Sequence, residues 1–158
     1  MTELSTAFPC PDCGDTVSRL AQACPHCGAP SSAKTEHSLR INWHTIDSDA
    51  ELSGVDLSGL DLSFSNLQNA NLESANLNRA NLHKANLSGA NLKNADLGHA
   101  NLESANLEDA DLTKARLVGA ELGHANLRGA CTDGTNWAAV KMRDTIGPNG
   151  GLINFVRI

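Results

Sequence analysis

Four cysteines near the N-terminus have the spacing that metal binding requires. They form the pattern C-x2-C-x10-C-x2-C within two knuckles, CPDCG and CPHCG, and are Cys10, Cys13, Cys24 and Cys27. Two such knuckles can place four thiolates at the corners of a tetrahedron, which is the geometry of structural zinc. Proline stiffens each knuckle, and Gly14 and Gly28 let the backbone curl so that amides reach the sulfurs. The pattern predicts that these cysteines bind one structural Zn²⁺.

The two knuckles resemble a short zinc ribbon. A redox dithiol would need a βαβ context, which the surrounding sequence does not predict, and iron is the minor alternative metal. So short a segment buries little apolar surface, so we expect the metal to supply its folding energy. Four thiolates fill a tetrahedral site, which leaves His26 in the second knuckle without a coordination position.

Downstream of a small, polar linker, one repeat dominates the chain. A five-residue unit, typically Ala-Asn-Leu followed by two variable residues, runs from Ala50 to Gly129 in sixteen consecutive copies. A step of five turns an α-helix by about 500° and scatters the leucines around it. In a straight strand the same step sends successive leucines to opposite faces. The period therefore predicts a coil in which each unit forms one side, with leucine and alanine pointing inward.

Outward charges indicate how many sides form one coil. A coil of twenty residues stacks opposite charges on each other, which is favourable between neighbouring strands. Coils of fifteen or twenty-five residues would stack Asp96 on Asp111 or on Glu121. The favourable pairs on twenty residues are Glu73 with Lys93, Asp96 with Arg116, Glu108 with Arg128 and Glu121 with Lys141.

The same twenty-residue register aligns asparagines and places glycines at corners. One column is a candidate for an amide ladder between coils; it contains Asn66, Asn86, Asn106 and Asn126. Glycine recurs after the leucine, where we expect corners that need a positive φ. These glycines are Gly54, Gly59, Gly89, Gly98, Gly119, Gly123 and Gly129.

The run of Ala-Asn/Asp-Leu units resembles the pentapeptide repeat family. The resemblance covers residues 50–129, about half of the chain. It implies an all-β fold, a right-handed quadrilateral β-helix whose lumen is filled by the leucine and the small residue. It also supports the twenty-residue coil, and hence about four complete coils with a partial one beyond.

Irregular units mark the expected N-terminal end of the coil. Val55, Leu60 and Ser65 replace inward alanines, and Phe64 is apolar at an outward position. A solenoid must shield its terminal coils from water. We therefore expect LRINWHTI to cover this end near Phe64; its apolar residues include Trp43 and Ile46.

At the C-terminal end, Thr132 and Trp137 take leucine positions, and we expect the rod to stop there. GGLINFVRI is interpreted as a capping strand, with a subunit contact as the alternative. The predicted layout follows in chain order. It is a flexible N-terminus at 1–8, the zinc ribbon at 9–30, a linker and N-terminal cap at 31–49, the β-helix at 50–144, and the C-terminal cap or subunit contact at 145–158.

Other residues that could do chemistry are scattered. On the four-sided register His83 and His124 share a face but not a column, His99 lies on another face, and Cys131 is an isolated outward thiol. No GxSxG, P-loop or HExxH motif occurs. A filled coil also offers no cleft for the paired carboxylates of acid/base catalysis. We predict that the protein is not an enzyme.

Charge and composition disfavour several classes of protein, namely nucleic-acid-binding, membrane and secreted proteins. The net charge of -6, with both signs interspersed, gives no basic footprint for nucleic acid. No apolar run approaches the roughly 18 residues of a membrane span, and the N-terminus lacks a signal-peptide pattern. Five cysteines, four of them in two tight pairs, indicate a reducing compartment, so a cytoplasmic location is expected.

These observations predict a non-catalytic protein-binding or scaffold protein that has protein partners. The resemblance supplies an alternative, because some pentapeptide repeat proteins mimic DNA, protect a type II topoisomerase from inhibitors, and dimerise through the C-terminal end. A homodimer through that end is therefore an option here. Cations interrupt the acidic columns and disfavour DNA mimicry; they are Lys84, Lys93, Lys114, Arg116 and Arg128. A metal-responsive regulator is a weaker alternative, because closed four-cysteine sites are usually inert.

Overall fold

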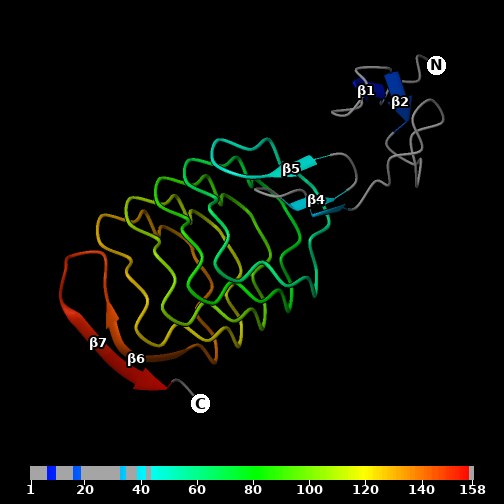
Figure 1. Ribbon diagram of the computed structural model, residues 1–158. Coiled ribbons are helices and arrows are strands. Elements are labelled where there is room, and N and C mark those ends of the chain that lie inside the picture. The colour runs from blue at the N-terminus through cyan, green and yellow to red at the C-terminus, as the bar shows by residue number, and fades with distance from the viewer. Residues whose placement is uncertain (1–6, 10–15, 19–32, 35–38, 42–43, 157–158) are drawn as a thin grey trace. The chain divides into compact units, whose positions relative to one another are not determined.

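The computed structural model describes residues 7–9, 16–18, 33–34, 39–41 and 44–156. The chain divides into two units, Met1–Ile46 and Asp47–Ile158. In the first, β1 (Ala7–Pro9) pairs antiparallel with β2 (Thr16–Ser18). A second antiparallel sheet has the order β3 (Ala33–Lys34), β4 (Leu39–Ile41) and β5 (His44–Ile46) (Figure 1).

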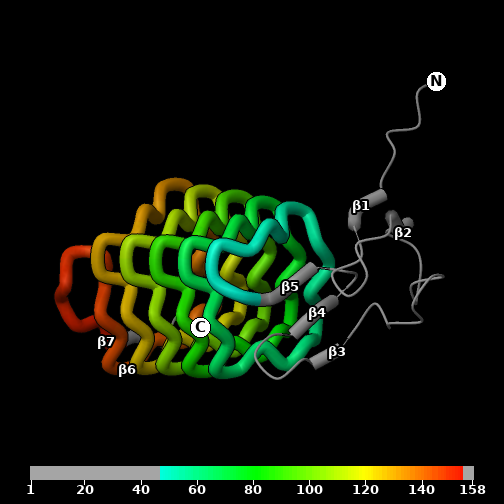
Figure 2. Tube along the Cα trace, turned by 45° about the horizontal axis from the view of Figure 1, so that its top comes forward, coloured from blue at the N-terminus to red at the C-terminus, as the bar shows by residue number. Residues whose placement is uncertain are grey.

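The second unit is a stack of four-sided coils. Every fifth residue from Glu51 onward forms a parallel bridge with the residue twenty positions later, up to Asn126 with Ile146. Within a bridge, Asn71 donates its N–H to the Ala50 carbonyl at 2.8 Å and accepts from the Leu52 N–H at 2.7 Å. Figure 2 shows the resulting parallel rungs. The predicted twenty-residue coil is confirmed, and bridges stepping by five over this range make five coils.

The lumen is filled by the two inward positions of each unit. Every leucine from Leu52 to Leu127 at the repeat position is at most 1% exposed, and so are the inward alanines from Ala70 to Ala125. Burying a leucine contributes roughly 1.5 to 3 kcal/mol. The stacked leucines therefore supply most of the driving force for the fold.

Each corner of the coil is the same tight turn. The inward alanine donates its N–H to the preceding leucine carbonyl, as in Ala75 to Leu72 at 3.0 Å. The second residue after the leucine has a positive φ, which a type II turn requires. Non-glycine residues there have φ between 51° and 60°. Gly98 and Gly123 lie one place too early and have no positive φ, so the expectation that they form such corners is wrong.

Asparagine side chains form ladders along the rod. Asn86 donates its amide to Asn66 Oδ1 at 3.1 Å, Asn106 to Asn86 at 3.3 Å, and Asn126 to Asn106 at 3.2 Å. The predicted amide ladder is confirmed. Each Oδ1 also accepts the N–H two residues later, as from Glu108 to Asn106 at 3.2 Å. Asparagine suits this position because one amide both donates and accepts.

The coil continues beyond Thr132 and Trp137, where the leucine pattern predicted that it would stop, and reaches about the predicted boundary at residue 144. Bridges join Arg116 to Asn136 and Asn126 to Ile146, so Thr132 and Trp137 do not stop it. The bridges use main-chain groups, so they tolerate other residues at the leucine position. β6 (Lys141–Ile146) belongs to the last coil and pairs antiparallel with β7 (Leu152–Val156), as Figure 1 shows.

The N-terminal end of the coil is described only in part. Trp43 and the side chain of Ile46 lie outside the described residues, so their capping role stays a prediction. Phe64, at the outward position noted in the sequence, is 68% exposed. None of the described residues belongs to a helix long and apolar enough to cross a membrane.

Truncating one rung of the ladder should destabilise the rod. Asn106→Ala removes two ladder bonds and one turn bond, so we expect a loss of about 1 to 3 kcal/mol in urea denaturation followed by circular dichroism. Asn136→Ala is the matched control, because the Asn136 side chain makes only the turn bond to the Ala138 N–H at 3.1 Å within the described residues. Equal losses for the two variants would contradict a stabilising ladder.

Candidate functional sites on the outward faces

The predicted zinc ligands lie outside the described residues, so the zinc site stays a prediction. They are Cys10, Cys13, Cys24 and Cys27. The strands around the first pair are described. Ala7 pairs with Ser18 and Pro9 with Thr16, so the first knuckle lies in the connection between two paired strands.

The histidines of the coil lie apart, as expected. The His83 ring is edge-on to Phe64, with centroids 5.7 Å apart. A His99 ring atom lies 2.6 Å from where a Cβ on Gly119 would stand. His124 Nε2 is 3.5 Å from an Arg143 guanidinium nitrogen.

Cys131 is exposed and free. Within the described part of the chain, no three or more His, Cys, Asp or Glu residues are grouped so as to hold a metal ion.

The bridges stack all four predicted charge pairs, and two of the four form ion pairs in the described residues. Arg116 contacts both Asp96 oxygens at 2.8 and 3.1 Å, and Lys141 contacts Glu121 at 2.6 Å. Lys93 instead pairs with Asp111 at 3.1 Å, which lies on the same side of the next coil. Glu73 acts on Lys93 only through its charge. In the described residues no ion pair joins Glu108 to Arg128, although the bridge between Asn106 and Asn126 stacks them as predicted.

Three aspartates at the bridging position, Asp56, Asp96 and Asp111, have lowered pKa values. For Asp96, burial raises the pKa, but the Gly98 amide and the Arg116 guanidinium outweigh burial. For Asp111, the Thr113 hydroxyl lowers the pKa most. These carboxylates therefore remain ionised, which makes them acceptors rather than general acids.

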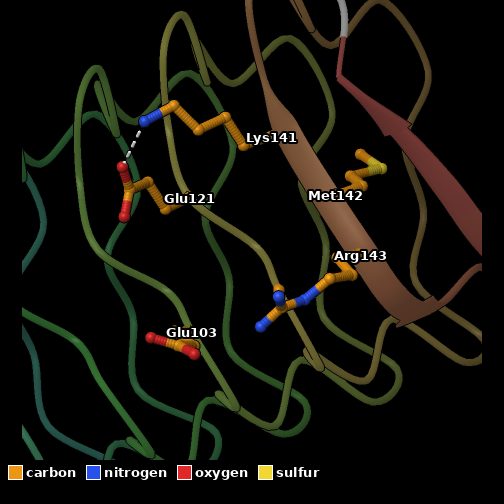
Figure 3. Close-up of a pocket in the computed structure, with 6 residues that line it drawn as sticks. Glu103, Glu121, Lys141, Met142 and Arg143 are labelled. Carbon is orange, nitrogen blue, oxygen red and sulfur yellow. Dashed lines mark hydrogen bonds and ion pairs between the residues drawn. The ribbon is translucent and has the colours of Figure 1, made fainter.

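One side of the rod, here called the third face, comprises residues 61–64, 81–84, 101–104, 121–124 and 141–144. It contains a hollow of about 260 Å³. The hollow is lined by Glu103, Glu121, Gly123, Lys141, Met142 and Arg143. In Figure 3 Lys141 extends toward Glu121 and Arg143 extends from β6 toward Glu103. Gly123, between these charged residues, contributes no side chain.

At the other end of the third face stands the exposed Phe64. Its φ is 60°, a value that is rare for a bulky residue. The Lys84 ammonium lies over its ring at 5.6 Å from the centroid. With His83 on the ring as well, Phe64 is held in place although it faces solvent. The sequence marked Phe64 as irregular, but it gave no sign of the hollow.

Main-chain bridges, a filled lumen and repeated corners define a four-sided β-helical solenoid. The family model for pentapeptide repeats matches residues 56–94 and 90–129, with eight copies. A search of the curated proteins gave no match.

Several solved structures of pentapeptide repeat proteins are similar to this chain. One is HetL, a pentapeptide repeat protein involved in heterocyst differentiation regulation from the cyanobacterium Nostoc sp. strain PCC 7120. The two sequences are 36% identical, the match covers 67% of this chain and 50% of the HetL chain, and the TM-score is 0.66. The pentapeptide repeat protein Rfr23 from the cyanobacterium Cyanothece 51142 is 39% identical over 59% of this chain and 64% of its own, with a TM-score of 0.58. A third is alr5209, a pentapeptide repeat protein from Nostoc PCC 7120, which is 31% identical. The match covers 60% of this chain and 76% of the alr5209 chain, with a TM-score of 0.34.

The chain belongs to the pentapeptide repeat family, whose members fold as right-handed quadrilateral β-helices. It spans 50% of the length of HetL and 64% of that of Rfr23.

Removing the Arg116 guanidinium should raise the pKa of Asp96. We expect Arg116→Gln to move the pKa of Asp96 toward its usual value in NMR titration of the carboxyl carbons. The pKa of Asp56, lowered chiefly by the Ser58 hydroxyl, should stay unchanged and serves as the control.

A lowered folded-state pKa adds stability above the unfolded-state pKa, and that stability is lost as pH falls through the folded value. Arg116→Gln should therefore lose less stability than the wild type on acidification below about pH 4. An unchanged Asp96 pKa would contradict the role given to Arg116.

Proposed function

We propose that the protein is a non-catalytic binding or scaffold protein whose partners are proteins. The observation that carries this proposal is the unbroken series of bridges from Glu51 to Ile146. It holds outward side chains in columns at a spacing of roughly 4.8 Å, which is a rigid display surface. The lumen is filled, so ligands have access only to the outer faces.

The lowered pKa values of Asp56, Asp96 and Asp111 make these three carboxylates unsuited to the role of general acid. A general acid at neutral pH needs a raised pKa. A cytoplasmic location and a homodimer through the C-terminal end belong to the same proposal. In the described residues β7 pairs only along the edge that faces β6.

We also propose that Cys10, Cys13, Cys24 and Cys27 hold one structural Zn²⁺ and form a second compact surface. Four thiolates in two C-x2-C pairs are a donor set that suits zinc. The pairing of β1 with β2 supports the proposal, because it pairs Pro9 with Thr16, the described residues that flank the first knuckle in the sequence. Bound zinc would supply folding energy to this segment and no catalytic chemistry.

Removing one cysteine of the second knuckle should abolish zinc binding. We expect Cys24→Ser to lose the metal, measured by inductively coupled plasma mass spectrometry, and to increase proteolysis before residue 47. The rod should keep its circular dichroism spectrum, because its core lies in the second unit. Cys131→Ser is the matched control and should retain zinc. Metal-free wild-type protein that resists proteolysis in this segment would refute the zinc site.

The binding function is tested by affinity capture with the full-length protein. We expect a protein partner that is retained at about one copy per chain and competed off by untagged protein. Absence of any such partner would refute the scaffold function.

The alternative is a DNA-mimic modulator of a type II topoisomerase. The net charge of -6 favours it. The contacts of Arg116 with Asp96 and of Lys141 with Glu121 disfavour it, because cations interrupt the acidic columns. We expect gyrase supercoiling, and its inhibition by a quinolone, to be unchanged by the protein. Protection of gyrase in this assay would replace the scaffold function with the alternative.

A further inference from the structure

We propose that Asn149, in the turn between β6 and β7, is a site of spontaneous covalent modification. Its side-chain amide is converted into isoaspartate through a cyclic imide that includes the main-chain nitrogen of Gly150. Water is the co-reactant, and no enzyme is required. The inference does not depend on the proposed binding function.

The turn consists of the residues Gly-Pro-Asn-Gly-Gly at 147–151, at the C-terminal end of the rod (Figure 1). The Gly150 N–H donates to the Gly147 carbonyl at 2.8 Å, and the Gly147 N–H donates to the Gly151 carbonyl at 2.7 Å. Proline favours the second position of such a turn, and Gly150 follows with a φ of 77°. Asn149 therefore lies at the tip of a hairpin.

The two groups that react are accessible in this turn. Asn149 and Gly150 are both exposed, and within the described residues the Asn149 side chain makes no hydrogen bond. Gly150 has no Cβ to hinder its nitrogen, and no atom of the fold lies within 4 Å of where a Cβ would stand. The Gly150 nitrogen can therefore reach the Asn149 Cγ when the hydrogen bond of the turn opens.

The asparagines of the coil lack this combination. Each ladder asparagine precedes a leucine whose N–H is bonded to the next coil, as in Leu87 to the Asn106 carbonyl at 2.7 Å. The exposed Asn94 precedes Ala95, whose methyl group hinders the nitrogen and whose N–H is bonded to a leucine carbonyl at 3.1 Å. Asn149 is the one asparagine in the sequence that precedes a glycine.

The reaction balances without an oxidant or a reductant. The Gly150 nitrogen loses its proton and attacks the Asn149 Cγ, the bond from Cγ to Nδ2 breaks, and the leaving group takes up a proton and departs as ammonia. The cyclic imide then adds one water. Opening at the Asn149 main-chain carbonyl gives isoaspartate, which continues the chain through its side chain, and opening at the other carbonyl gives aspartate.

Isoaspartate at position 149 would loosen the hairpin. It adds one methylene to the main chain inside the turn and introduces a negative charge. The two bonds of Gly147, and the bond from the Gly129 N–H to the Pro148 carbonyl at 2.9 Å, then lose their geometry. We therefore expect β7 to separate from β6 more readily after the modification.

Peptide mapping of aged protein tests the site. The full-length protein is incubated in mildly alkaline buffer beside a peptide of residues 145–153, and electron-transfer fragmentation distinguishes isoaspartate from aspartate. We expect Asn149 to be converted roughly three- to tenfold more slowly than in the peptide, because one hydrogen bond must open first. Asn94 should stay unmodified in the same digest.

Asn149→Gln is the matched control and should stay unmodified, because its longer side chain forms the cyclic imide far more slowly. Aged wild type should lose hydrogen-exchange protection in β7, and aged Asn149→Gln should keep it. Fresh Asn149→Asp introduces the charge without the extra methylene, so it should keep this protection as well.

Two results would overturn the modification site: an unmodified Asn149 after the peptide has been fully converted, or equal conversion of Asn94 and Asn149. Equal loss of β7 protection in aged Asn149→Gln and aged wild type would contradict the loosening of the hairpin.

Discussion

The main-chain bridge between a residue and the one twenty positions later is the interaction on which the rest of this protein depends. It places each leucine on the leucine of the next coil and aligns the outward residues in columns. Lys84 shows how far this control reaches, since its N–H bonds to the Glu103 carbonyl at 3.0 Å and holds a φ of 56°. The bridges therefore keep the corners in a conformation that most side chains disfavour.

Side chains form hydrogen bonds with the polar groups that the main-chain bridges leave unpaired. The asparagine oxygen accepts the first N–H of each turn and also the amide of the next coil, as at Asn86. Polar residues inside the lumen are satisfied in a similar way, since the buried Thr145 hydroxyl donates to the Leu122 carbonyl at 2.6 Å. In the described residues every buried side-chain nitrogen or oxygen has a partner. This leaves the outer faces as the place where groups are free to bind.

The coil was predictable from sequence because the same five-residue period sets the inward positions that fill the lumen and the outward positions that stack into columns. The hollow was not predictable, since Gly98 and Gly123 follow leucine in the same way and differ only in their neighbours from other coils. Lys93 likewise forms its ion pair with Asp111 and not with Glu73. This outcome depends on how far the side chains reach and not on the register of the coils. The end of the coil was misjudged because Trp137 disrupts the inward pattern but not the main-chain bridges. The zinc ligands follow from spacing alone and stay a prediction.

Because each corner turns the chain by a quarter of a revolution, the number of repeat units determines which side of the rod a later residue lies on. Each five-residue unit advances the chain by one side, and β6 forms the last sides before β7 folds back along it. Inserting one unit would therefore turn the C-terminal hairpin by a quarter of a revolution and reassign every later column to the next face. Inserting twenty residues would only lengthen the rod. Length and angular orientation of a terminal surface can thus change separately, by duplications of different size.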